Sequence, residues 1–260
     1  MDIISFKDNE KIKPNCIVHG DCLEVMPKIE SGSVDMILSD LPYGITSNEW
    51  DIVIPFEDLW ENYWRVLKKN GIIALTASQP FSSLLTMSQL KFWKHEWIWI
   101  KNRGSNFANT VREPFKEHEQ VLIFSRGKWT YNKQMQKRSE SGLERAKYPA
   151  NYSSKSKNYR DFEGRFKEVQ DELRVPSSYQ KFNCEVGLHP TQKPKELFKY
   201  LVRTYTIENE IVMDNCCGSG TTGIACQETN RKFILIEKDL ENFIIATKRL
   251  KDNDPLTKWS

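Results

Sequence analysis

The sequence predicts an α/β fold in which helices cover both faces of a mostly parallel sheet. Short apolar runs of strand length alternate along the chain with segments whose apolar residues recur at helical spacing. Four carboxylates stand at the ends of these apolar runs: Asp21, Asp40, Asp214 and Glu237. Because ligands of such sheets bind beyond the carboxyl ends of the strands, these carboxylates also predict where a ligand site lies.

In the first half of the chain, apolar runs predict strands at residues 16–19, 34–38, 72–75, 97–100 and 120–124. Helical spacing predicts helices at residues 23–29, 56–69 and 81–90. The middle helix is the clearest, because its large apolar residues fall on one side and Asn70-Gly71 is a common way to end a helix. The strands at 97–100 and 120–124 are expected to be antiparallel neighbours.

In the second half, strands are expected at residues 211–214 and 233–237, and helices at 193–204, 222–229 and 240–250. No apolar run approaches the ~20 residues that a membrane span requires. The charged N-terminus lacks the apolar centre of a secretory signal, so the expected location is the cytoplasm. The spacing of the six cysteines predicts neither a disulfide framework nor a metal site.

Positive charge is concentrated in one segment, residues 126–187. It contains 14 Lys and Arg against 8 Asp and Glu, a net charge of +6, whereas the whole chain has only +3. Nine aromatic residues lie in the same segment. Cations attract phosphate and aromatic rings stack on bases, so the composition fits a nucleic-acid contact as well as a solvated, irregular insert.

A glycine loop lies between the predicted strand 211–214 and the helix after it. Gly218 and Gly220 allow the backbone to turn tightly and a ligand to approach closely. Glu237 ends the next strand, where a carboxylate can accept the ribose hydroxyls of a nucleoside. The loop alone fits a dinucleotide or S-adenosylmethionine, but Asp214 would repel a pyrophosphate and attract a sulfonium.

The segment Asp40-Leu41-Pro42-Tyr43 follows the predicted strand at 34–38. An exocyclic amine of a base is a poor nucleophile, because its lone pair is delocalised into the ring. The Asp40 carboxylate and the Leu41 carbonyl would each accept one N–H and turn the lone pair toward a methyl donor. Pro42 fixes the backbone, and Tyr43 can stack on an unpaired base. The segment also fits an ordinary proline turn with a packed tyrosine.

Taken together, these motifs resemble the beta group of amino DNA methyltransferases. Asp40-Leu41-Pro42-Tyr43 is similar to the family's D/N/S-P-P-Y/F motif, and residues 214–222 are similar to its D-P-F-x-G-x-G-T-T cofactor loop. Further hallmarks are residues 20–24, 33–37 and the run His189-Pro190-Thr191-Gln192-Lys193-Pro194. The resemblance covers residues 16–125 and 187–250, and the catalytic motif precedes the cofactor loop, as in that circularly permuted group.

The resemblance implies a Rossmann-like fold and methyl transfer from S-adenosylmethionine to adenine N6 of double-stranded DNA, with the base flipped out. It gives the catalytic role to Asp40, Leu41, Pro42 and Tyr43. The residues that it assigns to the cofactor are Asp21, Cys22, His189, Thr191, Lys193, Asp214, Cys216, Gly218, Gly220, Thr221, Thr222 and Glu237.

The order of the motifs also predicts the organisation of the chain. Residues 1–125 would form the catalytic half, 126–187 an inserted target-recognition region, and 188–260 the cofactor-binding half. In the insert, the cations expected to contact DNA are Lys133, Lys137, Arg138, Lys155 and Lys157.

Adenine is expected rather than cytosine, because cytosine-N4 members of the family usually carry Ser where Asp40 stands. Ser39 precedes Asp40, but it is one place out of frame with Pro42 and Tyr43. The chain departs from the family pattern at Leu41, where the family carries Pro; the group needed there is a backbone carbonyl, which Leu41 also has. It departs again at Asn215 and Cys216, where the cofactor loop of the family carries Pro and Phe.

Three alternatives stay open at this point. The first is cytosine-N4 methylation by the same fold. The second is a nicotinamide-dependent oxidoreductase, which the glycine loop and Glu237 would also suit. The third is a DNA-binding protein that has lost its activity, which the departures at residues 215 and 216 would explain. The resemblance further suggests a bacterial or phage-encoded enzyme, a homodimer and a cognate restriction endonuclease as a partner.

Overall fold

The computed structural model describes residues 2–5, 11–44, 51–146, 172–185 and 192–253. The chain divides into two compact units, a large unit of residues 1–132 and 178–260 and a small unit of residues 133–177. In the described part of the chain, no helix is both long and apolar enough to cross a membrane. All six cysteines are free thiols.

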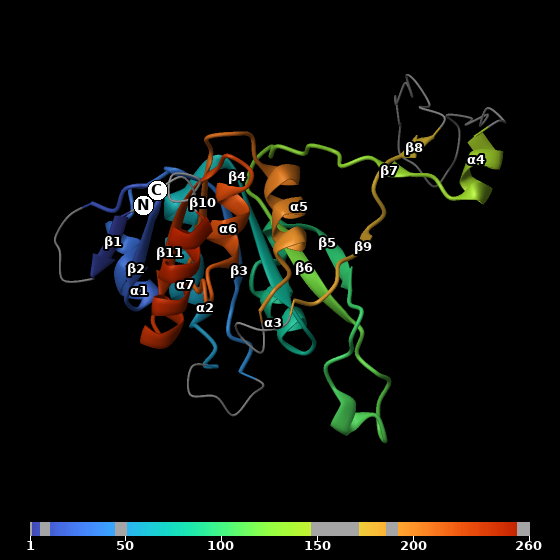
Figure 1. Cartoon of the computed structure of the whole chain (residues 1–260). Coiled ribbons are helices and arrows are strands. Elements are labelled where there is room, and N and C mark those ends of the chain that lie inside the picture. Colours follow the sequence, from blue (N-terminus) through green and yellow to red (C-terminus); the bar gives the residue numbers. More distant parts are fainter. Residues whose placement is uncertain (1, 6–10, 45–50, 147–171, 186–191, 254–260) are drawn as a thin grey trace. The chain divides into compact units, whose positions relative to one another are not determined.

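The large unit is built on one sheet whose strands run parallel over most of its width (Figure 1). In spatial order, the strands are β1 (Asp2–Ser5), β2 (Cys16–His19), β11 (Lys232–Glu237), β10 (Ile211–Asp214), β3 (Val34–Asp40), β4 (Leu67–Ala77), β6 (His118–Phe124), β5 (Trp93–Ile100) and β9 (Tyr179–Lys181). Neighbours from β1 to β4 are parallel, whereas β6 is antiparallel to both β4 and β5. The short strand β9 adds to β5 in parallel.

Helices cover both faces of this sheet. One face packs against α1 (Cys22–Val25), α2 (Phe56–Val66) and α3 (Phe81–Ser88), and the other packs against α5 (Lys195–Tyr205), α6 (Thr221–Gln227) and α7 (Leu240–Asn253). Successive strand residues point to opposite faces, so Cys16 and Val18 join the first core and Ile17 the second. This architecture confirms the predicted α/β fold with a mostly parallel sheet.

The prediction of a helix over residues 56–69 was wrong at its end. The helix α2 stops at Val66, and β4 begins at Leu67 rather than at Ile72. Leu67 is buried and pairs with Val34 on β3. Sheet pairing and burial of this side chain therefore outweigh the helical spacing of the local sequence.

Two short strands of the large unit carry no pattern from which they could be predicted. The strand β1 has four residues at the edge of the sheet, and β9 has three residues next to β5. The strand β9 and Trp129, which packs on the second core, belong to the large unit. The small unit is therefore narrower than the predicted insert of residues 126–187.

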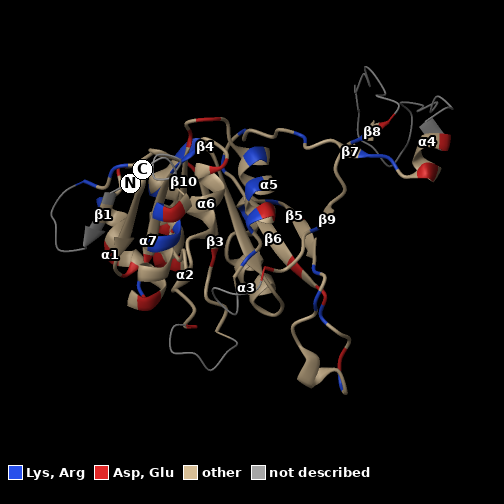
Figure 2. Ribbon diagram, viewed as in Figure 1, with Lys and Arg blue, Asp and Glu red and all other residues tan. Residues whose placement is uncertain are grey.

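The small unit contains an antiparallel pair of two-residue strands, β7 (Gln136–Lys137) and β8 (Leu173–Arg174), and the helix α4 (Glu140–Ala146). Figure 2 shows cations on β7 and carboxylates on α4. Lys133 and Lys137 are exposed and Arg138 is half-buried, whereas Lys155 and Lys157 lie outside the described residues. The role of the small unit in target recognition stays a prediction.

Candidate active site

One cavity of about 1690 Å³ lies beyond the carboxyl ends of the parallel strands. The strands β10 and β3 are neighbours, but the chain continues from β10 to β11 on one side and from β3 to β4 on the other. This is the switch point at which α/β sheets bind their ligands. Pockets for one small molecule usually measure ~300–1,000 Å³, so this cavity has room for more than one ligand.

The cavity brings together most of the residues that the sequence singled out. Those that line it are Asp21, Cys22, Asp40, Leu41, Pro42, Tyr43, Lys193, Asp214, Cys216, Gly218, Thr221 and Glu237. Gly220 and Thr222 lie behind this lining, where they shape the glycine loop. His189 and Thr191 lie outside the described residues. The motifs near residues 40 and 214 therefore face the same space, although they are far apart in sequence.

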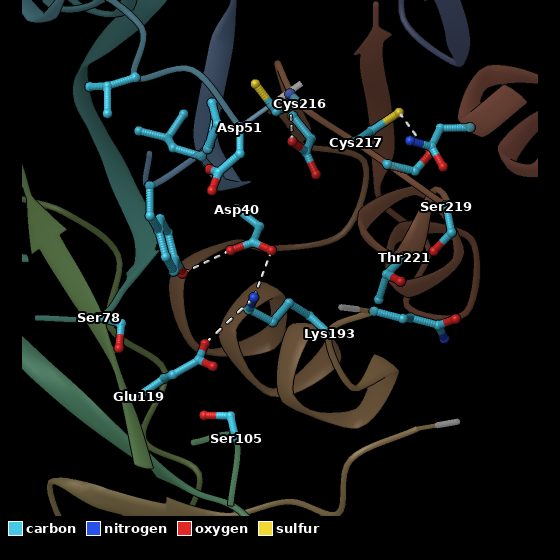
Figure 3. Close-up of a pocket in the computed structure, with 18 of the residues that line it drawn as sticks. Asp40, Asp51, Ser78, Ser105, Glu119, Lys193, Cys216, Cys217, Ser219 and Thr221 are labelled. Atoms are coloured by element: carbon cyan, nitrogen blue, oxygen red, sulfur yellow. Dashed lines mark hydrogen bonds and ion pairs between the residues drawn. The ribbon is translucent and has the colours of Figure 1, made fainter. Parts of the chain in front are cut away.

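Asp40, the last residue of β3, lies at the centre of a cluster of donors (Figure 3). Its Oδ1 accepts hydrogen bonds from the Tyr43 hydroxyl at 2.9 Å and from the Thr76 hydroxyl. Its Oδ2 lies 2.6 Å from Nζ of Lys193. A carboxylate has about four acceptor positions, and three donors use three of them. The side chain is still 28% exposed, so one acceptor position can serve a ligand in the cavity.

Lys193 bonds the catalytic motif rather than the glycine loop. Its side chain is 9% exposed, and its ammonium contacts the carboxylates of Asp40, at 2.6 Å, and Glu119, at 3.5 Å. Burial alone would lower the pKa of Lys193, but these two carboxylates outweigh burial and raise it. Lys193 therefore stays charged and holds the Asp40 carboxylate in place.

The ion pair extends one step further, to Lys101 at the end of β5. Glu119 on β6 accepts from Lys101 through Oε1 and faces Lys193 through Oε2. Two cations and two carboxylates therefore alternate from Lys101 to Asp40, with no net charge among them. Neither Glu119 nor Lys101 was predicted from the sequence. Nothing in the spacing of two single charged residues on β-strands sets them apart from surface charges.

Two neighbouring side chains contact the Tyr43 ring. The ring stacks on Phe81 with centroids 5.0 Å apart, and the Lys193 ammonium lies 5.7 Å from its centroid. Burial, together with the nearby charges of Asp40 and Glu119, raises the pKa of the Tyr43 hydroxyl well above its ordinary value. The hydroxyl is therefore a proton donor to Asp40 over the whole physiological range.

The glycine loop after β10 is tied to the end of β11. The Gly218 N–H donates to Oε2 of Glu237 at 2.7 Å, and the Asp239 N–H donates to Oε1 at 2.8 Å. Gly218 and Gly220 have φ of +51° and +79°, a region that other residues rarely adopt. A Cβ on Gly220 would also lie 3.1 Å from the Cβ of Ala246. The glycines are thus required by the backbone, and Glu237 keeps acceptor positions for a ligand.

Asp214 lies beneath this loop and is almost fully buried. Its Oδ1 accepts from the Ser39 hydroxyl at 2.7 Å and from the Cys216 N–H at 3.1 Å. Its Oδ2 accepts from the Thr222 hydroxyl. Burial raises the pKa of Asp214 to about 7, although these hydrogen bonds act in the opposite direction.

This raised pKa predicts how stability depends on pH. The unfolded chain loses this proton near pH 4, but the folded protein keeps it to about pH 7. The free energy of unfolding should therefore fall as the pH rises through this window. The side chain at position 214 cannot ionise in Asp214→Asn. The free energy of unfolding of this variant, relative to that of the wild type, should therefore rise by at most on the order of 4 kcal/mol between pH 4 and pH 7. Urea unfolding of both proteins at pH 5, 6, 7 and 8 measures the difference, and parallel pH curves would contradict it.

Two further groups line the far end of the cavity. Asp21 accepts from the Leu23 N–H at 2.9 Å and pairs with Lys238 at 2.9 Å, and these contacts lower its pKa although burial opposes them. A hydrogen bond between the free thiols of Cys22 and Cys216 lowers the pKa of Cys22. The same contact, together with burial, raises the pKa of Cys216 well above its ordinary value. Cys216 thus packs where the related motif carries Phe, against both the first core and a second thiol.

Comparison with known proteins places this geometry among DNA methylases. The N6_N4_Mtase family model, described as DNA methylase, matches residues 34–248. The type II methyltransferase M.HinfI of Haemophilus influenzae is 27% identical, over 96% of this chain and 72% of its own length. The M1.HpyAVI–SAM complex has a TM-score of 0.60 at 25% identity, over 90% of this chain and 98% of that one. The cytosine-N4-specific PvuII DNA methyltransferase has a TM-score of 0.60 at 15% identity, over 94% of both chains, and shows the fold alone.

Proposed function

This chain belongs to the N6_N4_Mtase family of DNA methylases, and from that premise we propose that it transfers a methyl group to N6 of adenine in double-stranded DNA. The family covers methylation of two exocyclic amines, so the choice between adenine and cytosine depends on the acceptor that faces the base. The methyl donor that we assign is S-adenosylmethionine.

The orientation of two neighbouring residues on β3 supports adenine. Asp40 lines the cavity, whereas Ser39 is fully buried and donates its hydroxyl to Asp214. Cytosine-N4 members of the resembling group usually carry Ser at the motif's first position. Here a serine stands one residue away, but it is turned from the cavity, so the acceptor left for a base is a carboxylate. This is the observation that carries the proposal.

The residues of the cavity suit activation of an amino group. One N–H would be accepted by Asp40 and the other by the main-chain carbonyl of Leu41, which turns the nitrogen lone pair toward the donor. The Asp40 carboxylate needs little reorganisation when a substrate arrives, because Lys193 and Thr76 already hold it. The amino group would take the fourth acceptor position of Asp40 or displace the Tyr43 hydroxyl.

The other end of the cavity suits the donor. S-adenosylmethionine supplies a methyl group on a cationic sulfonium, and carboxylates attract that charge. The carboxylates of Asp21 and Glu237 supply this attraction, and Asp214 adds to it only in its ionised form, above about pH 7. The free acceptor positions of Glu237 suit ribose hydroxyls. M1.HpyAVI, a protein of the same fold at 25% identity, was solved as its SAM complex.

The choice of base can be tested directly. Purified protein would be incubated with methyl-labelled S-adenosylmethionine and duplex DNA of mixed sequence, and the nucleosides analysed by mass spectrometry after digestion. We expect label in N6-methyladenine. Label in N4-methylcytosine alone would show that cytosine is the target base. Cytosine is the alternative because the cytosine-N4-specific PvuII enzyme has the same fold. Sequencing of the methylated DNA would then give the target site.

We further propose that the small unit contacts the DNA backbone through its exposed cations. Lys133→Ala with Lys137→Ala should weaken DNA binding. The salt slope of log K should fall by about 0.9 for each phosphate that the variant no longer neutralises. The matched control replaces Lys69 and Lys232, which are exposed and lie at the amino ends of β4 and β11, away from the cavity. Fluorescence anisotropy across a salt series measures both slopes, and an unchanged slope in the first variant would rule out this contact.

A further inference from the structure

An arm, residues 102–116, links β5 to β6 and projects beyond their ends (Figure 1). It belongs to the large unit, outside the segment that the sequence assigns to DNA recognition. A single helical turn, Phe107–Asn109, forms its tip. The length and composition of this arm are not needed to join two antiparallel strands, which two residues can connect.

The arm has a built structure of its own. The Asn106 side chain accepts from the Lys116 N–H at 2.7 Å and donates to Glu113 at 3.1 Å and to the Pro114 carbonyl at 3.0 Å. The Phe115 ring packs on Gly104 so closely that a Cβ there would lie 2.4 Å from it. These contacts join the two limbs, so the tip is presented in a defined position and loses little entropy on binding.

The tip carries apolar side chains that nothing in the described chain covers. Phe107, the first residue of the helical turn, is 83% exposed, and Val111, two residues after the turn, is 85% exposed. Single exposed apolar residues are common on protein surfaces. An aromatic ring exposed to this extent on a braced tip, next to a second apolar side chain, is suited to insertion into a partner.

The charge around the tip specifies the kind of partner. Residues 102–116 contain three cations, Arg103, Arg112 and Lys116, and one carboxylate, Glu113. Cations occur on both limbs (Figure 2). Three cations against one carboxylate leave the arm with an excess of positive charge. This combination fits the phosphate backbone of DNA around an apolar insertion.

The arm also forms part of the wall of the active-site cavity. Its residues 103–109, with Glu113 and Lys116, line the same cavity as Asp40 and Tyr43. Figure 3 shows Ser105 of the arm among the lining residues, with Asp40. A base that reaches Asp40 must therefore leave its helix close to the arm.

From these observations we propose that the arm binds duplex DNA at the target site and that Phe107 enters the base stack as the target base leaves it. The proposal rests on the function proposed above. The ring of Phe107 would fill the space beside the vacated position, while Arg103, Arg112 and Lys116 hold the flanking phosphates. Apolar wedges of this kind offset the unstacking that extrusion of a base requires.

The test compares Phe107→Ala with the wild type on two duplexes that carry the mapped target site. In one duplex the target base is paired, and in the other it faces an abasic position, so that little pairing opposes its extrusion. Single-turnover methyl transfer should fall by at least about tenfold on the paired duplex, because extrusion costs a few kcal/mol, and by less than about twofold on the abasic one. Ile244→Ala, an exposed apolar side chain on α7 that does not line the cavity, is the matched control.

The outcomes separate this proposal from the proposed function. An equal loss on both duplexes, or no loss on either, would overturn the wedge. If sedimentation shows that Phe107→Ala converts a dimer to a monomer, the tip contacts a second copy of the chain. This result would also overturn the wedge role of Phe107. Wild-type transfer to cytosine would refute adenine as the target, but the comparison of the two duplexes would still decide the role of Phe107.

Discussion

Asp40→Ala is expected to lower the single-turnover rate of methyl transfer on the order of 10³-fold, at the upper end of what one preorganised polar group contributes to a transition state. The variant removes the carboxylate that Tyr43, Thr76 and Lys193 hold in place. Without it, one N–H of the amino group has no acceptor, and the developing positive charge on nitrogen has no counter-charge. Rapid quench with labelled S-adenosylmethionine measures the rate.

The loss should be in the chemical step rather than in binding. Asp40 lies at the end of β3, whereas the glycine loop and Glu237 form the part of the cavity assigned to the cofactor. Cofactor affinity, measured by calorimetry, should therefore stay within about twofold, a few tenths of a kcal/mol. Glu61→Gln is the matched control, because this carboxylate is exposed on α2 and does not line the cavity. A variant at position 40 that keeps more than a tenth of the wild-type rate would refute the assigned role.

The sequence predicts the parts of this site that depend on strand ends. Asp40, Asp214 and Glu237 each end a short apolar run, and neighbouring parallel strands bring their carboxyl ends to one edge. Local apolar runs are sufficient to find such strands. The sequence also predicts the glycine loop, because the positive φ values at Gly218 and Gly220 leave little choice of residue there.

The sequence could not predict the ion-pair chain behind Asp40. Lys101, Glu119 and Lys193 come from the end of β5, from β6 and from the segment before α5, and no periodicity relates their positions. They meet because the antiparallel pair β5 and β6 places Lys101 beside Glu119, and because α5 packs on the sheet. Long-range pairing of this kind is decided by the tertiary fold. The same is true of Leu67, whose pairing with Val34 ended a helix that local spacing continued.

Lys193→Met tests which end of the cavity this residue serves. The sequence resemblance assigned Lys193 to the cofactor, whereas its ammonium lies 2.6 Å from Asp40 and 3.5 Å from Glu119. Loss of one partner from a buried ion pair costs ~3–5 kcal/mol. If about 3 kcal/mol of this cost raises the barrier to methyl transfer, because Asp40 is displaced, the transfer rate falls by about 100-fold. Cofactor affinity should change little, and a large loss of affinity with an unchanged rate would support the cofactor role instead.

The pH profile distinguishes a positioning role from a merely structural one. In Lys193→Met, the carboxylates of Asp40 and Glu119 would face each other without the cation between them, so the pair would take up a proton more readily. A protonated Asp40 is a weaker acceptor, and the rate of the variant should therefore rise with pH over a range where the wild type is flat.

Two further variants serve as controls. Lys193→Arg, which keeps the charge, should recover part of the rate. Lys199→Met removes a cation from the helix α5 that follows, where it pairs with Glu196 and Glu228 outside the cavity, and should change neither the rate nor its pH profile. If Lys193→Met and Lys199→Met show the same pH profile, Lys193 does not position Asp40.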